Sequence, residues 1–147
     1  MREAGFGDLG GIYEVEVRSF ERPYTREMLA LLLSLAGRYA LVAECGSGIV
    51  GYAVAVPYVD MVAHLASIAV LPECRGRGIG SKLLEMLEDR LREAGFYIIF
   101  LETWVSNRAA RAFYEKRGYR PLLVLPRYYE WGEDAILYAK LLVGSVG

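Results

Sequence analysis

The sequence predicts an α/β fold in which a mixed β-sheet carries helices on both faces. Short apolar runs rich in β-branched residues alternate along the chain with longer segments whose apolar residues recur at helical spacing. The length of 147 residues and the hydrophobic content of 54% suffice for one buried core. No repeat, linker or low-complexity tract interrupts the sequence, so we expect residues 1–147 to form a single domain.

Two helices and a hairpin are predicted in the first half of the chain. Asp8 is a candidate N-cap for a helix that runs to Phe20, and Thr25 is a candidate N-cap for a second helix. The apolar runs 39–44 and 49–56 follow, and they are separated by Cys45-Gly46-Ser47-Gly48. Small turn residues between two such runs favour a pair of antiparallel strands.

Strands and helices alternate in the second half. Apolar residues recur at helical spacing from Gly78 onward, and Gly95 is placed to end that helix. The other predicted elements are strands at about 61–71, 97–104, 119–125 and 135–142, and a helix over 107–117 that Asn107 would cap.

A glycine-rich turn, Arg75-Gly76-Arg77-Gly78-Ile79-Gly80, lies between a predicted strand and a predicted helix. The first N–H groups of a helix lack intrahelical partners and carry partial positive charge, so they suit an anion. The glycines permit close approach of a phosphate, and the arginines add charge. The spacing fits neither a P-loop nor a dinucleotide fingerprint. The turn therefore predicts the pyrophosphate of a nucleotide-like cofactor, with an ordinary flexible turn as the alternative.

The pattern Arg-x-x-Gly-x-Gly at this position resembles the acetyl-CoA loop of the GNAT superfamily of N-acetyltransferases. Three further segments, 67–73, 101–107 and 112–119, are similar to the strands and helix of that family. Residues 128–135, Tyr-Tyr-Glu-Trp-Gly-Glu-Asp-Ala, resemble the branch that acetylates protein α-amino groups. That branch includes archaeal and eukaryotic N-terminal acetyltransferases and the bacterial enzyme that acts on ribosomal-protein alanine.

The resemblance implies a GNAT-like, mostly antiparallel sheet with one central parallel strand pair. Those strands, which end near Val70 and Trp104, would splay apart and admit the pantetheine arm of acetyl-CoA. The family usually opens with a strand, which in this chain can be only a few residues long. Acetyl-CoA is the implied co-substrate, and the residues implied to contact it are Ile68, Ala69, Val70, Arg75, Gly76, Arg77, Gly78, Ile79, Gly80, Ser81, Asn107, Tyr114 and Lys116.

His64 and Glu102 are the candidate acid–base residues. His64 is the single histidine of the chain, and Glu102 lies in an apolar strand, where a carboxylate needs a partner. A strand histidine with a satisfied imidazole is the alternative. A zinc ion would need more ligands than these two, so we expect no metal. The resemblance implies that His64 and Glu102 deprotonate the substrate amine.

Tyr114 is the candidate general acid for the departing thiolate, a role implied by the resemblance, although a tyrosine of the core is the alternative. Backbone N–H groups near Ile68 or Ala69 would stabilise the oxyanion. Because a peptide α-amine has a pKa of about 7.7–8.0, against about 10.4 for lysine, its deprotonation needs little help from a base.

Two segments, Arg22-Pro23-Tyr24 and Tyr128-Tyr129, resemble the loops that clamp the first residues of a peptide in this branch. The implied reaction is transfer of acetyl to the free N-terminal α-amine of a protein or peptide by direct attack on the thioester. Nascent chains or ribosomal proteins are the implied partners. The alternatives are a small amine such as a polyamine or antibiotic, a lysine side chain, or a non-catalytic CoA-binding module. The two segments could also be ordinary surface loops.

Composition excludes several other classes of protein. A net charge of −1 argues against a general nucleic-acid binder, and no apolar run is long enough for a membrane span. The N-terminus lacks an apolar signal segment, so we expect a cytoplasmic protein. Cys45 and Cys74 lack metal-ligand spacing and are expected to be free thiols. One asparagine, no glutamine and fourteen arginines favour a thermophile, although a GC-rich genome would also favour arginine.

Overall fold

The computed structural model describes residues 1–142, which fold as one seven-stranded sheet with helices on both faces. The strand order is β1-β2-β3-β4-β5-β7-β6. The strands are β1 (Arg2–Glu3), β2 (Ala40–Cys45), β3 (Gly48–Pro57), β4 (Val62–Val70), β5 (Ile98–Trp104), β6 (Arg120–Leu125) and β7 (Ala135–Leu141). The α-helices are α1 (Leu9–Ser19), α2 (Arg26–Ala36), α3 (Ile79–Glu93) and α4 (Arg108–Lys116), and 3-10 turns lie at Phe6–Asp8, Gly37–Tyr39, Val59–Met61 and Pro72–Cys74.

The predicted α/β class and the mostly antiparallel sheet are confirmed. Each pair of neighbouring strands is antiparallel except β4 and β5, which are parallel. The opening strand β1 has only two residues, as expected. None of the described helices is both long and apolar enough to cross a membrane.

The two predicted N-caps of the first half differ in outcome. The Thr25 hydroxyl accepts a hydrogen bond from the backbone N–H of Met28 at 3.1 Å, so Thr25 caps α2 as predicted. Asp8 precedes α1 but does not cap it with its side chain. A 3-10 turn before the helix directs the Asp8 carboxylate backward, where it accepts from the Gly5 N–H and pairs with Arg2. The helix also ends one residue early, because Phe20 has extended backbone angles.

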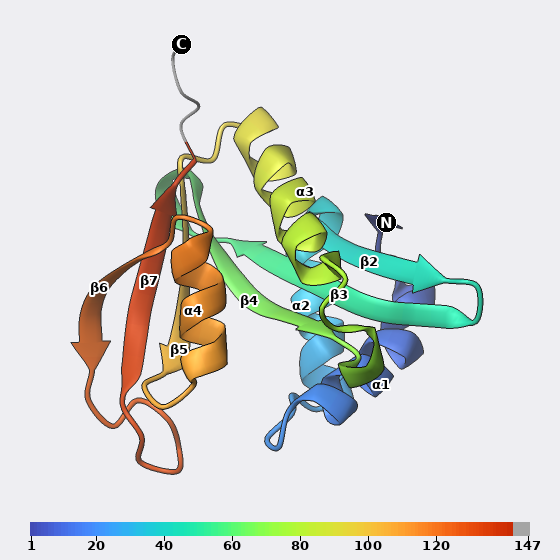
Figure 1. The fold of residues 1–147 in the computed structure, drawn as a ribbon. Helices are drawn as coiled ribbons and strands as arrows, with labels where there is room; N and C mark the ends of the chain where they lie inside the picture. Colours follow the sequence, from blue (N-terminus) through green and yellow to red (C-terminus); the bar gives the residue numbers. More distant parts are fainter. Residues whose placement is uncertain (143–147) are drawn as a thin grey trace.

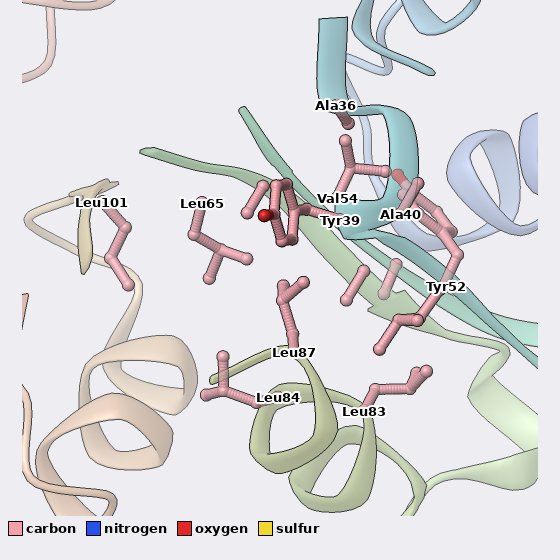
Figure 2. Close-up of a cluster of buried hydrophobic side chains, with 14 of the residues drawn as sticks. Ala36, Tyr39, Ala40, Tyr52, Val54, Leu65, Leu83, Leu84, Leu87 and Leu101 are labelled. Atoms are coloured by element: carbon pink, nitrogen blue, oxygen red, sulfur yellow. The ribbon is translucent and has the colours of Figure 1, made fainter. Parts of the chain in front are cut away.

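The helices form two layers around the sheet (Figure 1). α3 packs on β2, β3 and β4 from one face, and α1 and α2 cover β3 and its neighbours from the other. Figure 2 shows how α3 directs Leu83, Leu84 and Leu87 at the sheet, where Leu65 and Leu101 are buried. The apolar residues that recur at helical spacing in the sequence therefore form the buried face of α3.

The central parallel strands pair over only three residues and then diverge. Val62, Ala63 and His64 pair with residues 98–100, and no further β4–β5 pairs follow. β5 remains paired with β7 as far as Trp104, while β4 follows β3 as far as Val70. The two strands consequently separate, as Figure 1 shows. This is the predicted splay.

A β-bulge and the strand register determine which backbone groups of β4 face the splay. The register between β3 and β4 shifts so that Ala66 has no partner. The Leu71 N–H donates to the Val50 carbonyl at 2.8 Å. Because hydrogen-bonded and non-hydrogen-bonded pairs alternate between antiparallel strands, the backbone groups of Ala69 turn toward β3. Those of Ile68 and Val70 turn toward the splay.

Candidate active site

A cavity of about 460 Å³ lies between the diverging end of β4 and the helices α3 and α4. Its lining combines β4, the glycine turn, the end of α1 and one face of α4. The lining residues are Ser19, Phe20, Ile68, Ala69, Val70, Cys74, Arg75, Gly76, Gly78, Ile79, Gly80, Ser81, Ala109, Ala110, Phe113, Tyr114 and Arg117. Most of the residues predicted to contact a cofactor are thus brought together.

The glycine turn forms an open cradle at the start of α3. Gly76 and Gly78 have φ values of +80° and +78°, a left-handed conformation that side chains disfavour. A Cβ atom at either position would meet no other atom within 4 Å, so the space above the turn is open. Arg75 donates from Nε to the Val70 carbonyl at 2.9 Å, which joins the turn to the end of β4.

One polar atom in the cavity has no partner. The Ser19 hydroxyl, at the end of α1, is buried and makes no hydrogen bond with the described residues 1–142. A buried hydroxyl without a partner costs free energy. Ser19 lines the cavity, although its hydroxyl oxygen is itself buried.

Three residues predicted to contact a cofactor do not line this cavity: Arg77, Asn107 and Lys116. The Asn107 side-chain oxygen accepts from the Ala110 N–H at 3.1 Å, so Asn107 is the N-cap of α4. Lys116 lines a second cavity of about 390 Å³, which shares Ser81 and Arg117 with the first.

His64 and Glu102 form the predicted pair. His64 lies opposite Phe100 in the parallel register, and Glu102, two residues further on, points to the same face of the sheet. His64 Nε2 lies 2.7 Å from Glu102 Oε1, and the two side chains are 29% and 16% exposed. The imidazole also stacks on Phe100, with ring centroids 4.7 Å apart. This arrangement holds a proton acceptor in a fixed place.

Three tyrosines gather around the Glu102 carboxylate. Burial, Glu16 and Glu102 raise the pKa of the Tyr24 phenol above its ordinary value. Burial and Glu102 likewise raise the pKa of Tyr128 and, more strongly, that of Tyr129. The two predicted substrate loops therefore converge on the same carboxylate. These side chains, Tyr24, Tyr128, Tyr129, His64 and Glu102, are together called the acceptor slot below.

A contact between a cation and an aromatic ring joins the two loops of the acceptor slot. The Arg22 guanidinium carbon lies 4.2 Å from the ring centroid of Trp131. Trp131 in turn stacks on Tyr129, with centroids 4.6 Å apart. Pro23, which has a fixed φ, stands between Arg22 and Tyr24 and limits how the first loop can move.

Residues 9–119 match the sequence pattern of the Acetyltransferase (GNAT) family. The chain is a member of this family. It is 40% identical over 142 residues to an uncharacterised N-acetyltransferase of Methanocaldococcus jannaschii, covering 95% of this chain and 90% of that protein. It is 31% identical over 154 aligned positions to an N-alpha-acetyltransferase of Saccharolobus solfataricus, covering 97% and 92%. The crystal structure of the ribosomal-protein-S18-alanine N-acetyltransferase from Escherichia coli superposes with a TM-score of 0.84 at 30% identity, covering 97% and 93%.

In this N-acetyltransferase, Tyr114 lines the cavity between β4 and α4. It projects from α4 into the cavity that Ile68 and Val70 also line, and burial raises the pKa of its phenol well above the ordinary value. A tyrosine with a raised pKa remains protonated and able to donate at neutral pH. Within residues 1–142, no three His, Cys, Asp or Glu side chains lie together as a metal site would need.

Several residues around the site were not predicted, among them Glu16, Ser19, Arg117 and Trp131. Arg117 hydrogen-bonds to Ser81 and lies 3.8 Å from the Phe113 ring centroid, at the edge of the cavity. Arg117 follows Phe113 by four residues, a spacing that places the two side chains side by side on a helix and could have indicated this contact. Glu16 lies four residues after Ile12 on the apolar face of α1, where a carboxylate is unexpected.

Proposed function

We propose that this N-acetyltransferase transfers the acetyl group of acetyl-CoA to the free α-amine at the N-terminus of a polypeptide. The observation that carries the proposal is the His64–Glu102 pair, in which His64 Nε2 lies 2.7 Å from Glu102 Oε1. Three tyrosines, Tyr24, Tyr128 and Tyr129, lie near the same carboxylate. The named activities of the Saccharolobus and Escherichia coli proteins support a polypeptide α-amine as the acceptor. Ribosomal proteins and nascent chains are the acceptors that this reading favours.

The cavity in the splay fits the co-substrate. The backbone of Ile68 and the N–H of Val70 face the splay and could pair with a pantetheine amide, while the Val70 carbonyl already accepts from Arg75. The cradle above Gly76 and Gly78, at the start of α3, suits a pyrophosphate. Acetyl-CoA brings an activated thioester, and the chain's own residues position it beside the acceptor slot.

The reaction follows from the placement of these groups. The His64–Glu102 pair accepts the proton that the amine loses, directly or through water, and the amine nitrogen bonds to the thioester carbon. The Ile68 N–H, which faces the splay, stabilises the oxyanion better than Ala69 can, because Ala69 pairs with β3. As the carbon–sulfur bond breaks, Tyr114 donates a proton to the leaving thiolate.

The aromatic wall favours a chain terminus over other amines. Tyr24, Tyr128 and Tyr129 come from two loops that Arg22 and Trp131 join, and a free chain terminus would enter between these loops. A lysine carries backbone on both sides and fits such an opening poorly. A polyamine would gain most from several carboxylates, whereas the walls of the acceptor slot are mainly aromatic.

A steady-state acetylation assay tests the proposal. Peptides that differ in their first two residues are compared with spermidine and with N-blocked peptides that contain lysine. We expect kcat/KM to be highest for a peptide with a free α-amine and to vary with its first two residues. A higher kcat/KM for spermidine than for every peptide would refute the proposal and favour a small-amine acetyltransferase.

A further inference from the structure

Glu16 is a buried carboxylate that the proposed reaction does not use. It lies in α1 and is only 2% exposed, with the apolar Ile12 and Val15 on the same face of the helix. A buried carboxylate is costly unless hydrogen bonds satisfy it. Its retention on an apolar face therefore calls for a specific set of partners.

The two oxygens of Glu16 serve two different regions of the molecule. Oε1 accepts from the Tyr52 hydroxyl of β3 and lies 3.4 Å from the Ser67 hydroxyl of β4. Tyr52 and Ser67 are themselves 2.7 Å apart. Oε2 accepts from the backbone N–H of Tyr24 at 2.8 Å. One oxygen thus faces the sheet, and the other holds the loop between α1 and α2.

Tyr24 is consequently anchored at both ends. Its backbone N–H is held by Glu16, and its hydroxyl donates to the Ala66 carbonyl at 3.2 Å. Ala66 is the bulged residue of β4, midway between His64 and Ile68. The ring of Tyr24 is therefore fixed relative to the strand that carries both the acid–base pair and the backbone groups facing the splay.

We propose that Glu16 is a positioning residue that fixes Tyr24 as a wall of the acceptor slot. Connecting loops are mobile unless their backbone groups find partners, and a preformed slot lowers the entropy cost of binding a peptide. The Glu16–Tyr24 hydrogen bond supplies that order without touching the substrate. This inference rests on the proposed function, because it assigns Tyr24 to the acceptor slot.

Three variants separate positioning from simple core stability. Glu16→Met removes the acceptors of both the Tyr24 N–H and the Tyr52 hydroxyl and leaves the Tyr24–Ala66 hydrogen bond in place. Tyr52→Phe removes only the partner on the sheet side and leaves the Tyr24 N–H bonded. Glu16→Gln is the conservative variant, because its amide oxygen can accept from Tyr24 while its NH₂ donates to the Tyr52 hydroxyl, which can in turn donate to Ser67.

We expect Glu16→Met to raise the KM for a peptide by about tenfold or more, since a hydrogen bond to a charged group is lost, with the KM for acetyl-CoA nearly unchanged. Glu16→Gln should retain the peptide KM within about threefold. Tyr52→Phe should lower the melting temperature without raising the peptide KM. If Tyr52→Phe and Glu16→Met raise the peptide KM alike, in proportion to lost stability, the positioning role is wrong.

Amide hydrogen exchange in the unaltered protein tests the anchor independently of any substrate. The Tyr24 N–H should exchange at least about a hundredfold more slowly than the Arg22 N–H of the same loop, and Glu16→Gln should preserve this protection. Equal exchange rates at the two positions would overturn the proposal, even if Glu16→Met does not fold. Protection of Tyr24 together with no turnover of any peptide would instead contradict the proposed function and leave the anchor standing.

Discussion

The cavity in the splay and the acceptor slot differ in how much backbone and how much side chain each presents to a ligand. The cavity offers backbone groups, on the diverging strand β4 and at glycines in left-handed conformations before α3, alongside side chains of α1 and α4. The acceptor slot consists of side chains from β4, β5 and two loops. A backbone site is damaged by adding atoms, whereas a side-chain site is damaged by removing them. Substitutions of the two kinds should therefore separate co-substrate binding from turnover.

The largest expected effect is in the acceptor slot. Glu102→Gln preserves the shape of the side chain but removes the basic carboxylate, so kcat should fall by roughly 10²–10⁴-fold while affinity for acetyl-CoA is unchanged. A double variant that also replaces His64 should be little worse than the poorer single variant, because the two groups act on one proton. Glu130→Gln, at an exposed position in the loop of Tyr129, is the control. Full activity of Glu102→Gln between about pH 6 and 9 would place the base elsewhere.

The second-largest expected effect is on the binding of acetyl-CoA in the cavity. Gly78→Val adds a branched side chain at a φ of +78°, above the cradle proposed for the pyrophosphate. Calorimetry should show the Kd for acetyl-CoA rising by about tenfold or more. Gly37→Val is the matched control, since Gly37 also has a positive φ of +56° and open space around it but lies between α2 and β2. Equal affinities in the two folded variants would show that the turn does not hold the pyrophosphate.

The difference between the two regions also explains what the sequence could predict. The glycine turn is a local feature, so the position of Gly76 and Gly78 in a turn between a strand and a helix could be predicted from the local pattern alone. The His64–Glu102 pair required the parallel strand pairing, which only the family resemblance provided. Glu16 has partners at positions 24, 52 and 67, and Trp131 meets Arg22 across the acceptor slot. Contacts between such distant positions arise from tertiary packing, which a single sequence does not encode in any local pattern.

The smallest expected effect concerns the join between the two loops. Arg22→Met removes the cation above Trp131, a contact of roughly 0.5–1 kcal/mol at an exposed site. The KM for peptide should rise by about two- to fivefold, with little change in kcat. Arg26→Met is the matched control, because Arg26 makes the same kind of contact with Tyr13, at 4.9 Å. The two variants should differ only in the peptide KM; identical KM values would mean that the Arg22–Trp131 contact does not shape the acceptor slot.

The identity of the acceptor amine is the central claim, and one measurement tests it directly. A single peptide with a free N-terminus and an internal lysine is incubated with the enzyme and acetyl-CoA, and tandem mass spectrometry locates the acetyl group. The slot geometry and the lower pKa of an α-amine both predict acetylation at the N-terminus, with little on lysine. Acetylation mainly at the lysine side chain, while the free N-terminus remains unmodified, would contradict the account.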